Sequence, residues 1–250
     1  MRTIHLILQG KGGVGKSLVS SLLCQYLLRN GHEILAVDTD PVNQTLTGYR
    51  DLPVTALEIL KGDDIDRRKF DQLIENIMRV GADHVVVDNG AATFVPLCAY
   101  LKENQTVDFL NEMGMRVLIH TVFTGGQAMK DTADGLASLV KHFSNVPLVV
   151  WLNRYFGEIA HNTKTFEDFK IYQENRDKIL ALIRIPQKSA QTFGKDLEEL
   201  FSRRQTFASA LADDSLPIMT RQRLKIFWNE VCQEIDKARL IGQPMSEEQP

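Results

Sequence analysis

The sequence is poor in the features of secreted, metal-binding and membrane proteins. Its three cysteines, Cys24, Cys98 and Cys232, form no CxxC pair and show no metal-type spacing. Isolated cysteines within apolar patterns are typical of reduced, buried thiols, which argues against a disulfide framework or a zinc module. No apolar run approaches the roughly 20 residues that cross a bilayer, and no charged leader precedes the first predicted strand. We therefore expect a soluble, cytoplasmic protein.

The chain also lacks a strong charge of one sign, internal repeats and low-complexity linkers. Its formal net charge is −3 at pH 7, so overall charge gives no indication of nucleic-acid binding. The 250 residues, 44% of them hydrophobic, are enough to bury one sizeable core. We predict a single domain over residues 1–241. Residues 242–250 are polar and contain proline, and we expect them to form a disordered tail.

Short apolar runs alternate with segments of helical periodicity. The runs that we interpret as strands lie at residues 3–9, 34–37, 83–87, 116–123, 147–152 and 179–185. Apolar residues recur at helical spacing between them, most clearly at residues 18–27, 70–78 and 128–143. Continuous apolar strands that alternate with amphipathic helices are typical of parallel sheets. We predict an α/β, three-layer fold with a mostly parallel, twisted sheet covered by helices on both faces.

Residues 10–17 read G-K-G-G-V-G-K-S between a predicted strand and a predicted helix, which satisfies the phosphate-binding pattern G-x-x-x-x-G-K-[ST]. Glycines let backbone N–H groups curl around phosphate oxygens, and the helix start directs further N–H groups at the same anion. Lys16 can neutralise phosphate charge and Ser17 can bind Mg²⁺. An accidental glycine turn would not require this context. The predicted nucleotide-binding residues here are Gly10, Lys11, Gly12, Gly13, Val14, Gly15, Lys16 and Ser17.

Polar side chains follow three other predicted strands, at the edge where parallel sheets bind ligands. Asp38 and Asp40 follow one strand, Asp88 follows the next, and Asn153 follows a later one. Mg²⁺ is usually held by one or two acids together with waters and phosphate oxygens. Turn-forming roles compete for Asp40, which precedes a proline, and for Asn153. The predicted Mg²⁺ residues are Ser17, Asp38, Asp40 and Asp88.

The lysine inside the loop, Lys11, makes this segment resemble the deviant Walker A motif of the ParA/MinD ATPases. The resemblance runs from residue 3 to about residue 240, with D-T-D-P at residues 38–41 as switch I. It implies a P-loop NTPase fold, ATP and Mg²⁺ as ligands, and an ATP-bound homodimer in which Lys11 reaches the partner's nucleotide. It also implies a partner protein that stimulates hydrolysis.

The same resemblance assigns roles to individual residues. Lys11, Lys16 and Asp40 would act in catalysis, with Asp40 orienting the attacking water and Asp38 assisting around the metal. The remaining assignments are Asp88 as the Walker B acid, Asn153 at the adenine edge, and Pro186 in the segment that packs against the base. One departure stands out: Asn89-Gly90-Ala91-Ala92 replaces the family's usual run of small residues and proline after the Walker B acid.

Branches of the family differ in features that the sequence can test. Iron–sulphur members need cysteines that this chain lacks, and MinD-type proteins end in a basic membrane helix, whereas Glu247 and Glu248 follow the last predicted helix. We therefore do not expect membrane binding. The segments IHLILQGKGGVGKS, DTDPVN and VVVDNGAATFVPL are most similar to the ParA-like proteins of conjugative plasmids, the TraL type. This similarity implies a role in conjugal transfer or in plasmid partition and maintenance.

The leading hypothesis is an ATP-binding, slowly hydrolysing ATPase that dimerises as a switch. The alternatives are a nucleotide-gated assembly factor with negligible hydrolysis, a MinD-like membrane-associated ATPase, and a metabolic P-loop enzyme, for which Lys11 would have no purpose. Residues 201–240 carry seven basic and five acidic side chains, so we expect at most weak, sequence-independent DNA binding. The residues for such binding would be Arg203, Arg204, Arg221, Arg223 and Lys225, and an ordinary solvated face is the competing interpretation.

Overall fold

The computed structural model describes residues 1–62, 64–161 and 163–241. Within these residues a seven-stranded sheet has the order β11-β8-β7-β1-β6-β2-β3, and each pair of neighbouring strands is parallel. Its strands are β1 (Thr3–Ile7), β2 (Ile34–Asp38), β3 (Val54–Ala56), β6 (His84–Asp88), β7 (Arg116–Thr124), β8 (Leu148–Asn153) and β11 (Ile179–Arg184). The predicted parallel α/β architecture is confirmed.

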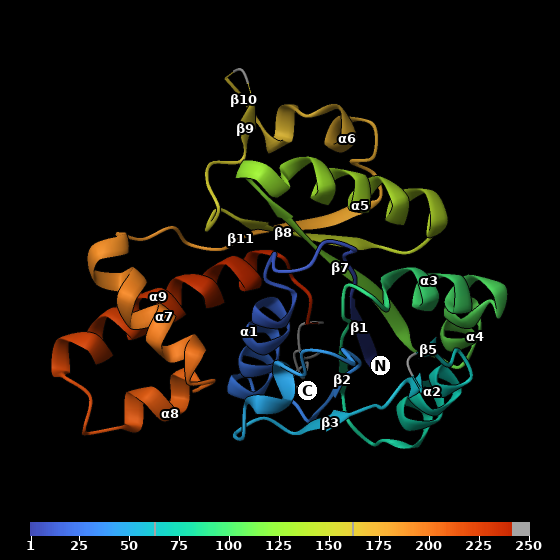
Figure 1. Cartoon of the computed structure of the whole chain (residues 1–250), viewed down its shortest axis with the longest axis horizontal. Coiled ribbons are helices and arrows are strands. Elements are labelled where there is room, and N and C mark those ends of the chain that lie inside the picture. Colours follow the sequence, from blue (N-terminus) through green and yellow to red (C-terminus); the bar gives the residue numbers. More distant parts are fainter. Residues whose placement is uncertain (63, 162, 242–250) are drawn as a thin grey trace, which may run out of the picture.

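Helices cover both faces of this sheet, so the core forms two apolar layers (Figure 1). One face packs against α1 (Lys16–Arg29), α7 (Lys195–Ser202), α8 (Phe207–Ala212) and α9 (Ile218–Lys237). The other face packs against α2 (Lys69–Arg79), α3 (Phe94–Glu103), α4 (Thr106–Glu112), α5 (Met129–His142) and α6 (Lys170–Gln173). Because side chains alternate along a strand, Ile7 enters the first layer and Leu6 the second.

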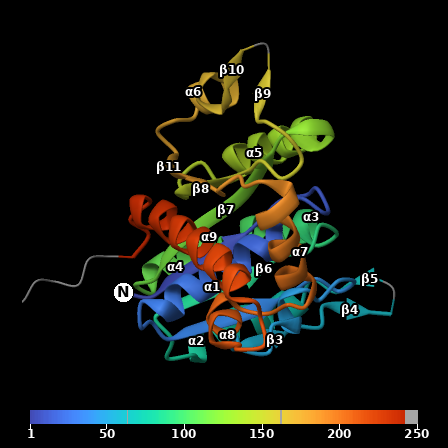
Figure 2. The same cartoon turned by 90° about the vertical axis from the view of Figure 1, so that its left-hand side faces the viewer.

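Helix α9 runs across α1, α7 and α8 and also contacts β11 (Figure 2). Its apolar stripe, which consists of Leu224, Phe227, Val231, Ile235 and Ala238, is buried, and Trp228 stacks on Phe207 of α8 with ring centroids 4.9 Å apart. The stripe therefore belongs to the hydrophobic core. None of the helices in the described part of the chain combines the length and the apolar character that a bilayer-crossing helix needs.

The structure contains elements that the sequence patterns did not predict. These are the edge strand β3, helices α3, α4, α6, α7 and α8, and two hairpins, β4 (Leu60–Lys61) with β5 (Asp64–Ile65) and β9 (Ala160–His161) with β10 (Lys164–Thr165). Strand β3 is short and half exposed, so it carries no apolar run. The predicted tail over residues 242–250, which includes Glu247 and Glu248, lies outside the described residues.

A chain of hydrogen-bonded aromatic side chains crosses the α1 and α9 face of the sheet. Trp151 Nε1 on β8 donates to His120 Nδ1 on β7 over 3.0 Å. His120 Nε2 lies 2.9 Å from His5 Nδ1 on β1, and His5 Nε2 lies 3.0 Å from His84 Nδ1 on β6. All four side chains are buried. Four strands are therefore joined by side chains as well as by their backbones.

Candidate nucleotide-binding site

The predicted site residues gather at the carboxyl edge of the sheet. In the sheet register, Ile7 on β1 lies beside Asp88 on β6, and Asp88 lies beside Asp38 on β2. Asn153 ends β8, two strands away on the other side of β1. Residues 8–15 leave β1 between these groups and lead into α1. Strand order therefore places the glycine-rich loop between two acids and an amide.

Backbone conformation in the loop depends on glycine at Gly13 and Gly15, whose φ angles are 73° and 104°. A Cβ on Gly15 would also lie 2.9 Å from Asn153 Nδ2. That amide group donates to Val14 O over 2.9 Å, and Val14 is buried. Asn153 therefore fixes the loop through Val14. The loop can adopt this conformation, with its N–H groups exposed, only with glycine at residues 13 and 15.

Lys16 begins α1, and its side chain folds back over the loop. Nζ donates to Lys11 O over 3.0 Å, and the residue is buried. Burial lowers the pKa of Lys16, and the nearby carboxylates of Asp88 and Asp40 oppose this shift. An ammonium group held inside a loop of backbone donors is suited to bind an anion.

Asp88 supplies a buried carboxylate, and only one of its two oxygens has a hydrogen-bond partner within the protein. Its Oδ1 accepts from Ser20 Oγ over 2.9 Å, whereas Oδ2 is buried without a hydrogen-bond partner. Burial raises the pKa of Asp88 to about 6; the Asp38 charge adds to the shift, and the hydroxyls of Ser17 and Ser20 and the charge of Lys16 oppose it. An unpaired buried oxygen is costly unless a ligand satisfies it. Carboxylate and hydroxyl oxygens at this position fit Mg²⁺, which prefers oxygen ligands.

Switch I keeps its two acids in different surroundings. Asp38 Oδ2 accepts from both N and Oγ1 of Thr47 over 3.1 Å, and burial raises the pKa of Asp38. Asp40 Oδ1 accepts from the backbone N–H groups of Val42 and Asn43 over 2.9 and 3.0 Å. Asp38 is thus fixed beside Asp88, whereas Asp40 caps the turn at residues 40–43, which contains Pro41.

The Lys11 side chain contacts α5, outside the loop. Its Nζ lies 2.7 Å from Asp131 Oδ2 on α5, and the two side chains are 44% and 48% exposed. Gln9 ties the same region down, because its Nε2 donates to Val122 O and Thr132 O while its Oε1 accepts from Lys11 N. The Lys11 backbone is therefore anchored, and its side chain reaches the surface.

The predicted base-binding residues lie at the same edge. Asn153 Oδ1 accepts from Tyr155 N over 3.1 Å, so both ends of this amide bond to the protein. Pro186 is half-buried and follows β11, the neighbour of β8. Both residues thus lie at the carboxyl edge of the sheet, and Asn153 supports the loop through Val14 O.

Several residues of this edge went unnoticed in the sequence. Ser20 could have been found, since it lies four residues after Lys16 on α1 and thus on the same helix face. Gln9, Thr47 and Asp131 gave no such local signal, because their roles depend on strand order and loop path.

The predicted basic surface is largely neutralised. Arg203 pairs with Glu199, Arg221 Nη1 lies 2.7 Å from Asp214, and Arg223 pairs with Asp196. Arg204 lies over Gly48, where a Cβ would contact its side chain. Of the five predicted DNA-binding residues, three are thus in ion pairs.

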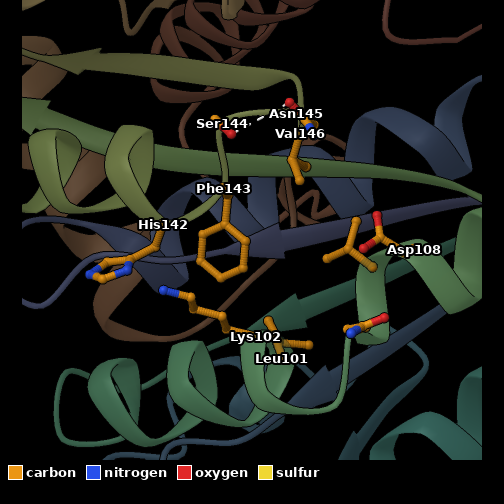
Figure 3. A pocket seen from close by; sticks show the side chains of 10 residues that line it. Leu101, Lys102, Asp108, His142, Phe143, Ser144, Asn145 and Val146 are labelled. Atoms are coloured by element: carbon orange, nitrogen blue, oxygen red, sulfur yellow. Dashed lines mark hydrogen bonds between the residues drawn. The ribbon is translucent and has the colours of Figure 1, made fainter.

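A shallow cavity of about 130 Å³ lies at the opposite edge of the sheet, between the α3–α4 turn and the α5–β8 turn (Figure 3). Lys102 and His142 lie on one side of it and Asp108 on the other, with the ring of Phe143 between them. It contains none of the predicted site residues, so the nucleotide site is assigned by the loop and the acids.

The fold, the loop and the acids together define a nucleotide-binding domain. Residues 5–197 match the family model of the CobQ/CobB/MinD/ParA nucleotide-binding domain, and the chain belongs to this family. It is similar to protein TraL of Escherichia coli, with 48% identity over 96% of this chain and 100% of the relative. The predicted resemblance to ParA/MinD proteins of TraL type is confirmed.

Solved structures show the same fold. The cell division ATPase MinD of Pyrococcus furiosus aligns over 95% of this chain and 99% of its own, with a TM-score of 0.56 and 18% identity. A MinC:MinD cell division complex of Aquifex aeolicus aligns over 95% and 96%, with a TM-score of 0.56 and 15% identity.

Proposed function

We propose that this protein is an ATP-binding, slowly hydrolysing ATPase that dimerises as a switch of the ParA/MinD type. The observation that carries the proposal is that two lysines of the same loop lie in different surroundings. Lys16 is buried over the loop, whereas the Lys11 side chain is half exposed and pairs with Asp131 at the surface. Exposed ion pairs contribute roughly 0–1 kcal/mol. Lys11 can therefore leave Asp131 for the phosphates of a second subunit's nucleotide.

Each remaining group has a role in this mechanism. The loop N–H groups and Lys16 bind the phosphates, and Ser17, Asp38 and Asp88 are the residues that would hold Mg²⁺. Bound Mg²⁺ would neutralise charge on the phosphate oxygens. Asp40 would orient the attacking water. Its Oδ1 accepts from two N–H groups of its own turn, so the turn fixes how this carboxylate can face a water molecule, and we expect slow turnover.

The biological role that we propose is conjugal transfer or plasmid partition in the cytoplasm. The motif resemblance to ParA-like proteins of conjugative plasmids and the 48% identity to TraL support it. A partner protein that stimulates hydrolysis would act by moving switch I. Weak DNA binding is a lesser part of the proposal, because three of its five arginine and lysine candidates are already paired.

Isothermal titration with ATP and Mg²⁺ tests the nucleotide site. Lys16→Ala should abolish tight binding, because it removes the buried charge that faces the phosphates. Lys130→Ala is the matched control, since Lys130 is an exposed lysine on α5, and it should bind like the wild type. Unchanged affinity in Lys16→Ala would refute the proposed site.

The second candidate is an assembly factor that binds ATP without appreciable hydrolysis. The engagement of Asp40 in its own turn favours this candidate. Phosphate release by the wild type separates the two. ATP-dependent dimerisation without phosphate release would favour the assembly factor.

A further inference from the structure

Asn89, the residue after Asp88, lies where switch I contacts residues 89–92, the segment that corresponds to the family's switch II. It is 1% exposed, in a segment without proline that departs from the familiar pattern. Its Oδ1 lies 2.6 Å from Thr93 Oγ1, at the start of α3, and 3.3 Å from Thr39 Oγ1, in switch I. Its Nδ2 donates to Gly90 O over 2.9 Å. One side chain therefore links switch I to the segment between Asp88 and α3.

A count of protons shows why an amide suits this position. Thr39 N–H donates to Asp88 O over 2.9 Å, and Asn89 Nδ2 donates to Gly90 O. Each threonine hydroxyl has two acceptors within hydrogen-bond distance: Thr39 Oγ1 lies 3.1 Å from Asp88 O and 3.3 Å from Asn89 Oδ1, and Thr93 Oγ1 lies 2.6 Å from Asn89 Oδ1 and 2.9 Å from Gly90 O. An amide accepts from both hydroxyls and still donates to the carbonyl. An apolar residue at this position would remove the acceptor that both hydroxyls share and the donor to Gly90 O, and with them the side-chain link between residues 39 and 93.

The contacts of Asn89 also bear on Asp40, which packs against switch II. A Cβ on Gly90 would lie 2.7 Å from Asp40 Cγ and 3.0 Å from Asp40 Cα. Switch I therefore packs directly on the backbone of Gly90, and Asn89 holds that backbone through the Gly90 carbonyl. Asp40 also follows Thr39, which Asn89 contacts. Movement of either loop must therefore displace the other loop or break the hydrogen bonds of Asn89.

We infer that Asn89 is a positioning residue that couples the two switch loops and sets the place of Asp40. This inference rests on the proposed function for its link to hydrolysis, but the coupling itself belongs to the fold. A proline ring would restrict the backbone conformation of this segment. In the absence of proline, the hydrogen bonds of the Asn89 side chain restrict it instead. The departure at residues 89–90 is thus a different way of holding switch II.

Hydrogen–deuterium exchange of the full-length protein without added nucleotide tests the coupling. Asn89→Ala should speed exchange of a peptide over residues 38–47 about tenfold, the factor expected from one or two lost hydrogen bonds. Thr93→Val, which removes a hydroxyl without changing the shape, should speed exchange in the same peptide by a smaller factor. Thr106→Val is the matched control, because Thr106 is a buried threonine at the start of α4, and it should leave that peptide unchanged.

Single-turnover phosphate release and ATP titration then test the link to Asp40. Asn89→Ala should lower the hydrolysis rate about tenfold while ATP affinity stays within about threefold, because a positioning role affects the rate and spares the phosphate contacts. If the wild type does not hydrolyse ATP, the proposed function fails while the exchange result still decides the coupling. Unchanged exchange over residues 38–47 in Asn89→Ala overturns the inference. If Asn89→Ala does not fold, Thr93→Val decides it alone.

Discussion

Single residues in this site are placed by contacts that lie far apart in the sequence. Gly15 is a clear case, since its left-handed backbone and its approach to Asn153 both exclude a side chain. The contact between Gly90 and Asp40 is another, because it joins the two switch loops. Such positions tolerate little change even though no phosphate contact is removed.

Gly15→Ala should destabilise the protein by roughly 1–2 kcal/mol, because a left-handed backbone is costly for alanine, and it should also weaken ATP binding. Gly81→Ala is the matched control, since a Cβ there would meet nothing within 4 Å, and it should change stability by less than about 1 kcal/mol. Thermal unfolding and ATP titration measure both effects. Wild-type ATP affinity in Gly15→Ala would contradict the loop geometry.

Two substitutions of Asp40 separate its turn role from its proposed catalytic role. Asp40→Asn keeps an oxygen that can accept from Val42 N and Asn43 N, whereas Asp40→Ala removes it. If Asp40 orients water as a carboxylate, both variants should lose phosphate release, and Asp40→Asn should bind ATP like the wild type. Normal phosphate release by Asp40→Asn would mean that Asp40 acts only in the turn.

At the scale of elements, the histidine chain across the sheet has a fixed direction. Tryptophan can only donate, so His120 must accept at Nδ1 and carry its proton on Nε2. His120 then donates to His5 Nδ1, and His5 in turn donates from Nε2 to His84 Nδ1. An added proton at any ring would set two donors against each other. Four neighbouring strands thus share one chain that requires neutral histidines.

Nitrogen NMR of the imidazole rings measures these tautomers directly. We expect His5, His84 and His120 to be Nε2–H tautomers that stay neutral down to about pH 5. Burial lowers the pKa of His84 to about 4 and that of His120 to about 3. Burial and the charges of His120, His84 and Arg116 hold the pKa of His5 well below its usual range. An Nδ1–H tautomer, or titration near pH 6.5, would contradict the chain.

Stability should therefore fall on the acid side. Unfolded histidines bind protons at about pH 6.5, above the lowered values in the fold, so stabilisation is complete above pH 6.5 and is lost as the pH falls toward 4. Each histidine contributes a slope of about 1.4 kcal/mol per pH unit in that range. The raised pKa values of Asp88 and Asp38 act in the opposite sense.

His84→Asn isolates the histidine contribution, because an amide oxygen can still accept from His5 Nε2 but does not titrate. Asp83, His32 and the N-terminal amino group also act on His84, and they are unchanged in this variant. Urea unfolding between about pH 7.5 and 4.5 should show a shallower loss for His84→Asn. If the free energy of unfolding falls with pH equally in both proteins, the pKa of His84 is not lowered in the folded state.

The sequence predicted the elements with strong internal patterns and missed those that depend on tertiary context. Buried strands such as β7 and β8 read as apolar runs, and the loop carries its own motif. Strand β3 is defined by its pairing with β2 rather than by its residues. The acids were predicted from their place after strands. The contacts of Lys11 with Asp131 and of Asn89 with Thr93 require a folded chain and could not be predicted.

For the whole molecule, we predict that a second copy of the chain completes the site. Lys11 is anchored through its backbone by Gln9, and its ammonium is half exposed beside Asp131. In a monomeric mechanism, removal of an exposed lysine changes stability by no more than about 0.5 kcal/mol. In the dimer, the loss of a buried charge partner typically costs roughly 2–5 kcal/mol of association.

Light scattering after gel filtration with ADP, with ATP and with a non-hydrolysable analogue tests this claim most directly. The wild type and Lys130→Ala should read twice the chain mass of 28.3 kDa with ATP and Mg²⁺ and one chain mass with ADP. Lys11→Ala should still bind ATP through Lys16 and the loop. It should stay monomeric, because the lost contact weakens association by more than about tenfold. A Lys11→Ala protein that dimerises normally with ATP would contradict the proposed switch.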